Sequence, residues 1–209
     1  MTKSQLIKIF LKTERLQTER LILRKLMPSD YRDMFEYSCL SEVTKYLLWY
    51  PHENENQTYR YLEEIQYSYK RGEFFDWAVV LKDSGKMIGT CGYTSFDLPN
   101  KRVEIGYVLN SKYWGCGYAP EAIKAAIEFA FAELEFNRAE AHFIEGNSSS
   151  LKAAEKCGMT FEGILKDYML IKGEFKSIGI LGVTKDKFPF SNCYTIEKNK
   201  SGWLKNLIN

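Results

Sequence analysis

The chain has 209 residues, of which 45% are hydrophobic and 15% aromatic, so it is long and apolar enough to form one domain with a substantial core. Its 29 basic and 27 acidic residues nearly cancel, which argues against a protein that binds nucleic acid through bulk positive charge. The five cysteines form no Cys-x-x-Cys pair, only two histidines are present, and no apolar stretch reaches transmembrane length, so we expect reduced thiols, a cytoplasmic location, no metal site and no membrane partner.

The first half of the chain is predicted to contain one strand and two helices. Residues 1–17 are charged and ambiguous, and we treat them as an N-terminal extension. Proline and aspartate at a helix start, and glycine just after a helix end, mark the helix boundaries. The predicted elements are a strand at 21–26, a helix from Asp30 to about Cys39, and a helix that starts near Asn56 or Thr58, runs to Arg71 and is ended by Gly72.

Three consecutive strands are predicted next, at 75–81, 87–93 and 102–109. The segment Lys82 to Lys86 has the composition of a hairpin turn, so the strands should be antiparallel. Gly89 and Gly92 in the middle strand indicate a kink or a close approach of another backbone.

A short glycine loop then leads directly into a helix. Gly115 and Gly117 allow a tight turn, and Pro120 suits the first helical turn before the helix-forming run 122–131. Backbone amides at a helix N-terminus bind anions, so this loop is a candidate pyrophosphate site. An ordinary tight turn is the alternative. A dinucleotide fingerprint is disfavoured, because Pro120 occupies the position of its third glycine.

The last part of the chain contains one helix among strands. A strand is expected at 138–144, a helix at 151–157 capped by the turn Asn147 to Ser150, and a long hairpin over 161–183. Residues 188–209 form a C-terminal extension whose Trp203, Leu204, Leu207 and Ile208 are candidates for docking on the body. Together, the elements predict a mixed α/β (α+β) domain with a mostly antiparallel sheet.

Four segments in order resemble the GNAT (Gcn5-related N-acetyltransferase) superfamily, and within it the RimJ/RimL-type branch. They are 18–24, 103–109, 113–122 and 147–159. Gly117 and Ala119 match the phosphate loop of the superfamily, while Trp114 stands where glutamine or arginine is common. The resemblance covers roughly 18–187 and implies a GNAT domain there, with splayed central strands flanked by helices.

The resemblance implies an acetyl-CoA-dependent N-acetyltransferase. The acceptor that we prefer is the N-terminal α-amine of a protein or peptide, attacked directly in a ternary complex. The residues expected to bind acetyl-CoA are Val108, Leu109, Asn110, Trp114, Gly115, Cys116, Gly117, Tyr118, Ala119, Asn147 and Ser150. Cys116 is interpreted as a bystander, because direct transfer needs no covalent nucleophile.

The resemblance also implies catalytic roles. Glu104 is the expected general base, with a structural ion pair as the alternative. The Val108 N–H is expected to polarise the thioester, and Ser150 to protonate the departing thiolate, although Ser150 also suits a helix cap. Met169 stands where some relatives have a glutamate base, so a water relayed from Tyr168 or Asp167 is a further alternative.

Several alternatives remain open at this stage. A small-molecule amine such as an antibiotic or polyamine is the second candidate acceptor, and a non-catalytic acyl-CoA-binding regulatory module is the alternative of another class. No nucleic-acid partner is expected, and a homodimer is left open. His142 is expected to be an ordinary strand residue. The aromatic residues Trp49, Tyr50, Phe74, Phe75 and Trp77 fit either an acceptor pocket or the core.

Overall fold

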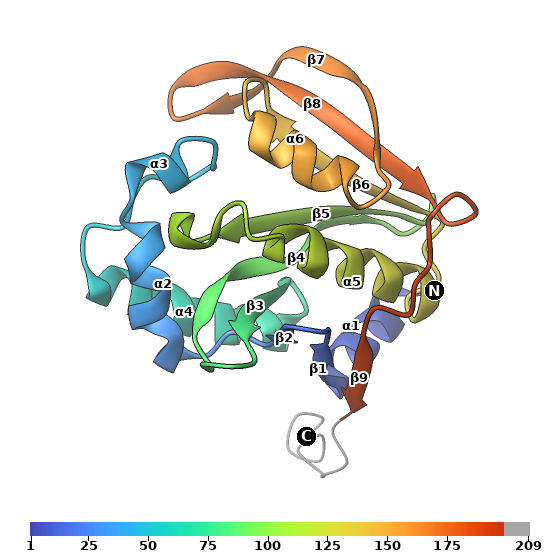
Figure 1. Cartoon of the computed structure of the whole chain (residues 1–209), viewed down its shortest axis with the longest axis horizontal. Coiled ribbons are helices and arrows are strands. Elements are labelled where there is room, and N and C mark those ends of the chain that lie inside the picture. The colour runs from blue at the N-terminus through green and yellow to red at the C-terminus, as the bar shows by residue number, and fades with distance from the viewer. Residues whose placement is uncertain (199–209) are drawn as a thin grey trace.

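A computed structural model describes residues 1–198 of the protein, which fold around one large mixed sheet (Figure 1). The helices are α1 (Lys3–Lys12), α2 (Tyr31–Ser38), α3 (Ser41–Thr44), α4 (Glu55–Arg71), α5 (Tyr118–Ala132) and α6 (Ser148–Glu155), with 3-10 turns at Pro28–Asp30 and Ser111–Tyr113. The strands are β1 (Thr13–Gln17), β2 (Leu21–Arg24), β3 (Phe75–Leu81), β4 (Met87–Asp97), β5 (Arg102–Leu109), β6 (Arg138–Ile144), β7 (Thr160–Ile171), β8 (Glu174–Thr184) and β9 (Thr195–Lys198).

The sheet has the strand order β7-β8-β6-β5-β4-β3-β2-β1-β9. Every neighbouring pair is antiparallel except β5 and β6, which are parallel. This confirms the predicted fold class, a mixed and mostly antiparallel sheet with flanking helices. Within residues 1–198, no helix combines the length and apolar character needed to cross a membrane.

Most predicted elements are confirmed, with shifted ends. The helix expected to start near residue 56 or 58 begins at Glu55 and ends at Arg71, and its C-cap Gly72 has a φ of 65°. The close approach expected at Gly92 is present, because a Cβ there would lie 2.4 Å from the Asp76 Cα. The helix expected at 151–157 instead spans Ser148–Glu155, since the Asn147 side chain already caps it.

Both ends of the described chain join the sheet. In α1, Phe10 is buried and its ring packs 5.1 Å from that of Trp77, which anchors the N-terminal helix to the core. β1 pairs with β9, and the Arg15 guanidinium binds the Glu197 carboxylate with an Nη2–Oε1 distance of 3.0 Å. The segments 1–17 and 188–198 therefore contribute a helix, the strand β1 next to β2, and the edge strand β9. The predicted docking of Trp203, Leu204, Leu207 and Ile208 lies outside the described residues.

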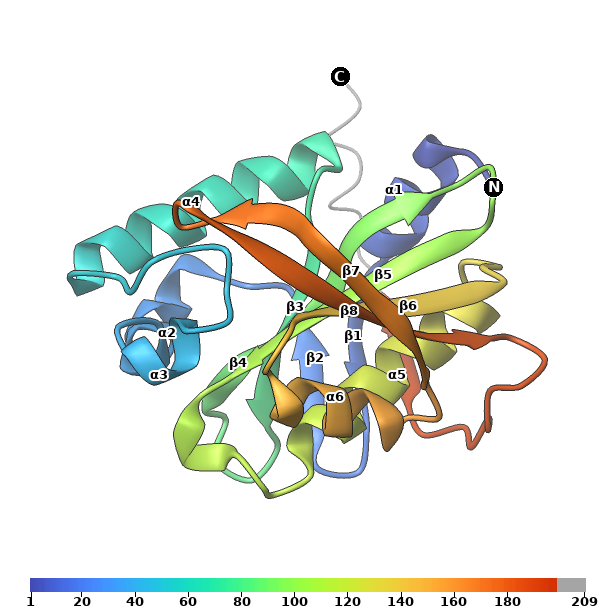
Figure 2. The same cartoon turned by 90° about the horizontal axis from the view of Figure 1, so that it is seen from above.

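Helices cover the two faces of the sheet differently (Figures 1 and 2). On one face α5 packs through Phe129, whose ring lies 5.6 Å from that of Trp77, and the Tyr93 hydroxyl donates to the Ala126 carbonyl. On the other face lie α2 and α4, and the buried Tyr37 of α2 is part of the core. Side chains alternate between faces along β3, so Trp77 faces α5 whereas Asp76 faces α2 and α4.

The sheet opens between β5 and β6. The two parallel strands pair only from Arg102↔Arg138 to Glu104↔Glu140. Beyond this point β5 stays paired with β4, and β6 stays paired with β8. The predicted splay of the central strands is thus confirmed, and the described structure contains a V-shaped opening with Glu104 and Glu140 at its vertex.

Candidate active site

The glycine loop forms an uncapped helix N-terminus. Gly115 and Gly117 have φ values of 79° and 83°, which favour glycine, and Gly117 is the N-cap of α5. No side chain of the described residues caps this helix, so the amides of Tyr118 and Ala119 remain available. A Cβ at Gly115 would meet no atom within 4 Å, so the loop backbone faces open space. These features suit an anion.

Arg20 fixes the loop from the start of β2. Its Nε lies 2.7 Å from Glu121 Oε2, its Nη1 donates to the Cys116 carbonyl at 3.1 Å, and its guanidinium lies 4.5 Å from the centre of the Tyr118 ring. Although burial raises the pKa of the Glu121 carboxyl, hydrogen bonds from Thr18 and Arg20 outweigh it and lower that pKa overall. The sequence analysis gave Arg20 no role in the site. Trp114 stands where a basic residue is common inside the loop, and Arg20 supplies positive charge beside the loop instead.

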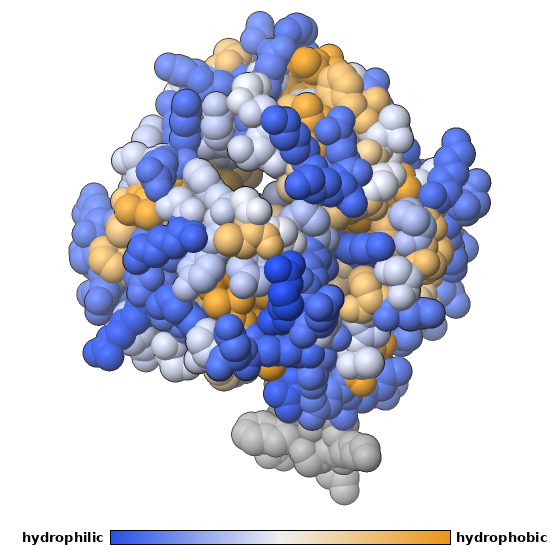
Figure 3. Space-filling view, viewed as in Figure 1, coloured by the Kyte–Doolittle hydropathy of each residue, from blue (hydrophilic) through white to orange (hydrophobic). Residues whose placement is uncertain are grey.

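A cavity of about 510 Å³ begins at this loop. Its walls are the loop, the end of β5, the residues around α3 and the first turns of α6. Lys45, Lys152 and Lys156 line it, and no acidic side chain except Glu42 does so among the described residues. Figure 3 shows the surface hollowed between the part that carries α6, β7 and β8 and the rest of the molecule. The charge and the exposed amides suit an elongated polyanion such as CoA.

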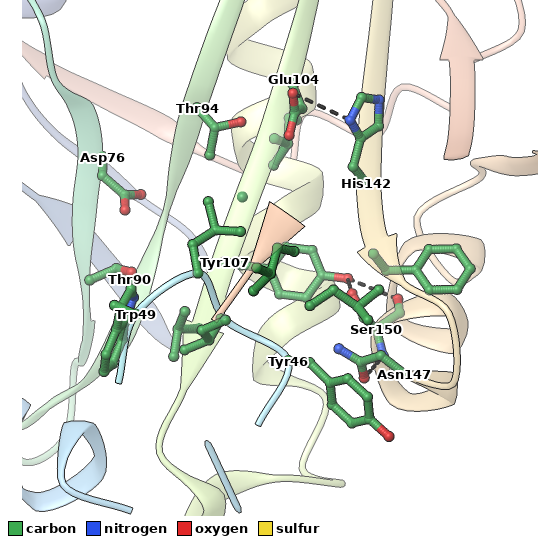
Figure 4. Close-up of a pocket in the computed structure, with 18 of the residues that line it drawn as sticks. Tyr46, Trp49, Asp76, Thr90, Thr94, Glu104, Tyr107, His142, Asn147 and Ser150 are labelled. Carbon is green, nitrogen blue, oxygen red and sulfur yellow. Dashed lines mark hydrogen bonds and ion pairs between the residues drawn. The ribbon is translucent and has the colours of Figure 1, made fainter. Parts of the chain in front are cut away.

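A second cavity, of about 310 Å³, lies against the α2 and α4 face (Figure 4). Its lining includes Tyr37, Tyr61, Asp76, Glu104 and His142. The two cavities share six lining residues, which are Tyr46, Leu47, Tyr107, Val108, Asn147 and Ser150. The cavities therefore meet at the opening between β5 and β6.

Glu104 and His142 stand at the vertex of this opening. Glu104 Oε2 accepts a hydrogen bond from the Ser95 hydroxyl at 3.1 Å and lies 3.5 Å from His142 Nδ1. On its other side, His142 Nε2 lies 3.5 Å from Glu140 Oε2, and Glu140 accepts a hydrogen bond from Arg138 at 2.7 Å. His142, expected to be an ordinary strand residue, is thus held between two carboxylates and lines the second cavity.

Tyr107 and Ser150 form a hydroxyl pair where the cavities meet. The Tyr107 Oη lies 2.7 Å from Ser150 Oγ and also donates toward the Ser150 carbonyl at 2.8 Å. Burial raises the pKa of Tyr107, so this hydroxyl keeps its proton at neutral pH. The Asn147 Oδ1 accepts from the Ser150 amide at 3.2 Å and caps α6. The sequence analysis gave Tyr107 no role, because its pairing with Ser150 joins β5 to α6 and leaves no local pattern in the sequence.

The backbone of β5 alternates in direction along the opening. The Asn110 amide donates to the Ile88 carbonyl of β4 at 2.8 Å, and the register continues through Leu109↔Gly89 and Val108↔Thr90. Since alternate residues of an antiparallel ladder point the same way, the amide of Val108 also faces β4. The amides of Tyr107 and Leu109 consequently face the opening.

Most of the other residues predicted to bind acetyl-CoA line the first cavity, and the candidate aromatics are divided between the second cavity, the core and the surface. Trp114, Gly115, Gly117, Tyr118 and Ala119 line the first cavity together with Val108 and Leu109. Asn110 is fully buried and Cys116 is exposed, and neither residue lines the two cavities. Among the candidate aromatics, Trp49 lines the second cavity, Phe75 and Trp77 belong to the core, and Phe74 packs against it. Tyr50 is 65% exposed.

The residues proposed for a water relay lie apart from the cavities. Tyr168 is exposed, and the Asp167 amide donates to the Ser177 hydroxyl at 3.3 Å. Neither residue lines the two cavities, whereas their neighbour Met169 lines the second. An apolar side chain therefore lines the second cavity at the position where the sequence analysis considered a glutamate base.

Comparison with known proteins agrees with this geometry. Residues 20–160 match the acetyltransferase (GNAT) domain. The chain is 33% identical over 175 residues to the uncharacterized N-acetyltransferase p20 of Bacillus licheniformis, covering 84% of this chain and 98% of that protein. It is 26% identical over 177 residues to the ribosomal protein uS5-alanine N-acetyltransferase of Escherichia coli (strain K12), covering 81% and 90%.

Among solved structures, the acetyltransferase (GNAT family) from Bacillus anthracis superposes with a TM-score of 0.73 at 26% identity, covering 82% of this chain and 99% of that one. The domain match, the relatives and the shared fold lead to the same assignment. The chain therefore belongs to the GNAT family of acetyltransferases, enzymes that use acetyl-CoA as the acyl donor.

Proposed function

We propose that this protein transfers the acetyl group of acetyl-CoA to a primary amine, which attacks the thioester directly in a ternary complex. The supporting observation is that a cavity bordered by lysines and a cavity bordered by carboxylates meet at one opening in the sheet. Two substrates bound from opposite faces would bring their reacting atoms together there. Such positioning can remove several kcal/mol from a bimolecular barrier.

In this proposal the first cavity binds acetyl-CoA. The pyrophosphate accepts hydrogen bonds from the amides of the loop 115–119 at the N-terminus of α5. Lys45, Lys152 and Lys156 offer further positive charge along the cavity. The pantetheine then runs along the unpaired edge of β5 toward the opening.

The thioester carbonyl is polarised by a backbone amide of β5. Sequence reasoning assigned this role to Val108, but the alternation of the ladder directs that amide to β4. We therefore assign the role to Tyr107, whose amide faces the opening beside the Tyr107–Ser150 hydroxyl pair. A preorganised donor of this kind typically contributes about 10²–10³ in rate.

Glu104 acts as the general base, assisted by His142. The attacking amine must lose a proton, and the Glu104 carboxylate lines the acceptor cavity while lying 3.5 Å from the His142 imidazole. The carboxylate takes the proton directly or through one water, and the imidazole orients it. General base catalysis typically contributes about 10²–10⁴ in rate.

The hydroxyl pair supplies the proton for the leaving group. Ser150 is near the thiolate in this arrangement and gives it a proton, while the Tyr107 hydroxyl, 2.7 Å from Ser150 Oγ, passes its own proton to Ser150 and regains one from solvent. The Ser150 role and the capping role of Asn147 are compatible, because the cap uses the Ser150 amide and leaves its hydroxyl free to act.

The preferred acceptor is the N-terminal α-amine of a protein or peptide. A relative that is 26% identical is named a ribosomal protein uS5-alanine N-acetyltransferase, which supports this class. A small-molecule amine is the second candidate, because the acceptor cavity ends inside the molecule at Asp76 and Tyr37.

The experiment is a release assay for CoA thiol on a panel of peptides and small amines, with mass spectrometry of the products. We expect CoA release only with an amine present, in equal amount to the amide formed. Glu104→Gln and Ser150→Ala together should reduce turnover strongly, and Glu104→Gln alone should leave acetyl-CoA binding unchanged. Thermal stabilisation by acetyl-CoA with no amide from any amine would instead indicate a binding module.

A further inference from the structure

The inner end of the acceptor cavity carries a carboxylate that the reaction does not use. Asp76 lies on β3, on the opposite side of the cavity from Glu104 and His142 (Figure 4). Its Oδ1 is inaccessible to solvent and has no hydrogen-bond partner among the described residues. The hydroxyl of Tyr37, which is 1% exposed, lines the same cavity and is equally unpaired there.

No positive side chain compensates this carboxylate. Among the described residues that line the cavity there is neither lysine nor arginine, and the only basic group, His142, lies near Glu104. Burial raises the pKa of Asp76 from 3.8 to about 7, and the Thr90 hydroxyl and the Trp77 amide oppose this only in part. A buried carboxylate with no charged partner and one unpaired oxygen is costly unless a ligand supplies the missing group.

A row of glycines connects Asp76 to the reaction centre. The register places Asp76 opposite Gly92 and Gly92 opposite Gly106, on three neighbouring strands. A Cβ at Gly92 would lie 2.5 Å from Asp76 Oδ1, so the missing side chain makes room for the carboxylate. Gly106 directly precedes Tyr107 and also lines the cavity. Between Asp76 and the opening the sheet therefore presents two glycines, and the Thr94 side chain lies over Gly106.

We propose that Asp76, with the hydroxyls of Tyr37 and Tyr61, binds a second ammonium group on the acceptor. This rests on the proposed function and specifies its substrate class. An ammonium has three donors, which match a carboxylate oxygen and two tyrosine oxygens in the same cavity. The substrate is then a diamine, or a peptide whose first residue carries an amino group in its side chain.

The strand spacing bounds the distance between the two nitrogens. Neighbouring strands lie about 4.8 Å apart, so Asp76 and Gly106 are separated by roughly 10 Å at the backbone. The Asp76 side chain and the hydrogen bonds at each end shorten the span that the acceptor must bridge. A flexible chain of intermediate length should fit best.

The test uses α,ω-diaminoalkanes from ethylenediamine to octamethylenediamine, each with a monoamine of the same length. We expect kcat/KM to be about 10–100-fold higher for the best diamine than for its monoamine. Asp76→Asn should remove this preference by raising KM for the diamine, with kcat nearly unchanged. Tyr37→Phe should act in the same direction, and Asp97→Asn, which removes a charge at the far end of β4, should leave the preference intact.

Peptides that begin with lysine or with norleucine, offered in parallel, distinguish a peptide from a free diamine as the source of the ammonium. Equal kcat/KM for diamines and monoamines in the unmodified protein would overturn the proposal while leaving the acetyltransferase function intact. If no amine is acetylated, the proposed function fails. Calorimetry of diamine binding to the CoA complex then tests by itself whether Asp76 binds an ammonium group. Binding that Asp76→Asn does not weaken would then refute it.

Discussion

Replacing Asp76 by asparagine should stabilise the ligand-free protein, and the gain should depend on pH. The folded state holds the pKa of this carboxyl at about 7, above its ordinary value of 3.8. Below about pH 4 the carboxyl is neutral in both folded and unfolded chains. Between about pH 4 and 7 the unfolded chain releases the proton and the folded chain retains it, so the native protein loses stability as pH rises and then levels off.

The size of the effect follows from the pKa change. A rise from 3.8 to about 7 corresponds to about 4 kcal/mol, at 1.36 kcal/mol per tenfold change in the ionisation constant. Asp76 keeps some accessible surface, and water in the cavity screens part of this cost. We therefore expect Asp76→Asn to gain about 2 kcal/mol over the unmodified protein above about pH 7, and almost nothing near pH 4.

Urea unfolding of both proteins across this pH range measures the difference. Asp97→Asn is the matched control, because hydrogen bonds from Asn100 lower the pKa of Asp97 and its loss should destabilise the protein at neutral pH, the opposite sign. A stability difference for Asp76→Asn that stays constant with pH, or a loss of stability at neutral pH, would refute the idea of an uncompensated carboxylate in the cavity.

Three further predictions concern the reaction centre and the glycine loop. Glu104→Gln should lower kcat by about 10²–10⁴ while acetyl-CoA affinity, measured by calorimetry, stays the same; unchanged kcat would remove Glu104 from its role. Tyr107→Phe should lower kcat by about tenfold or more in steady-state assays, because Ser150 loses its hydroxyl partner, and full activity would show that the pair is only structural. Gly115→Ala and Gly85→Ala both place alanine at positive φ, at 79° and 70° with open space around them, and should cost similar stability, about 1–2 kcal/mol. Only Gly115→Ala should weaken acetyl-CoA binding, by about tenfold, and equal affinities in the two variants would contradict the anion site.

The sequence predicted the elements whose signals are local. The hairpins of β3, β4 and β5 follow from turn residues, and α5 follows from its glycine loop and apolar face. The helix α1 was missed because its burial depends on Phe10 meeting Trp77, which lies far along the chain. The edge strand β9 pairs with β1, which is about 180 residues away in the chain, and the ion pair between Arg15 and Glu197 leaves no local pattern in the sequence.

The site was predictable where one motif carries the chemistry. The loop 115–119 and Asn147 to Ser150 have recognisable spacings, whereas Arg20, Tyr107 and His142 become site residues only through contacts between distant segments. The direction of the Val108 amide depends on the ladder with β4, which no single-strand pattern reveals. Asp76 resembles an ordinary strand residue until Tyr37 and the glycine row enclose it.

The proposal of direct transfer in a ternary complex can be tested by following both products in one experiment. Rapid mixing of the enzyme with acetyl-CoA alone, and then with an accepted amine, should release CoA only in the second case and in equal amount to the amide. Intact-mass analysis should find no acetyl group on the protein, including on the exposed Cys116. A burst of CoA without amine, with one acetyl group on the protein, would contradict direct attack and indicate a covalent intermediate.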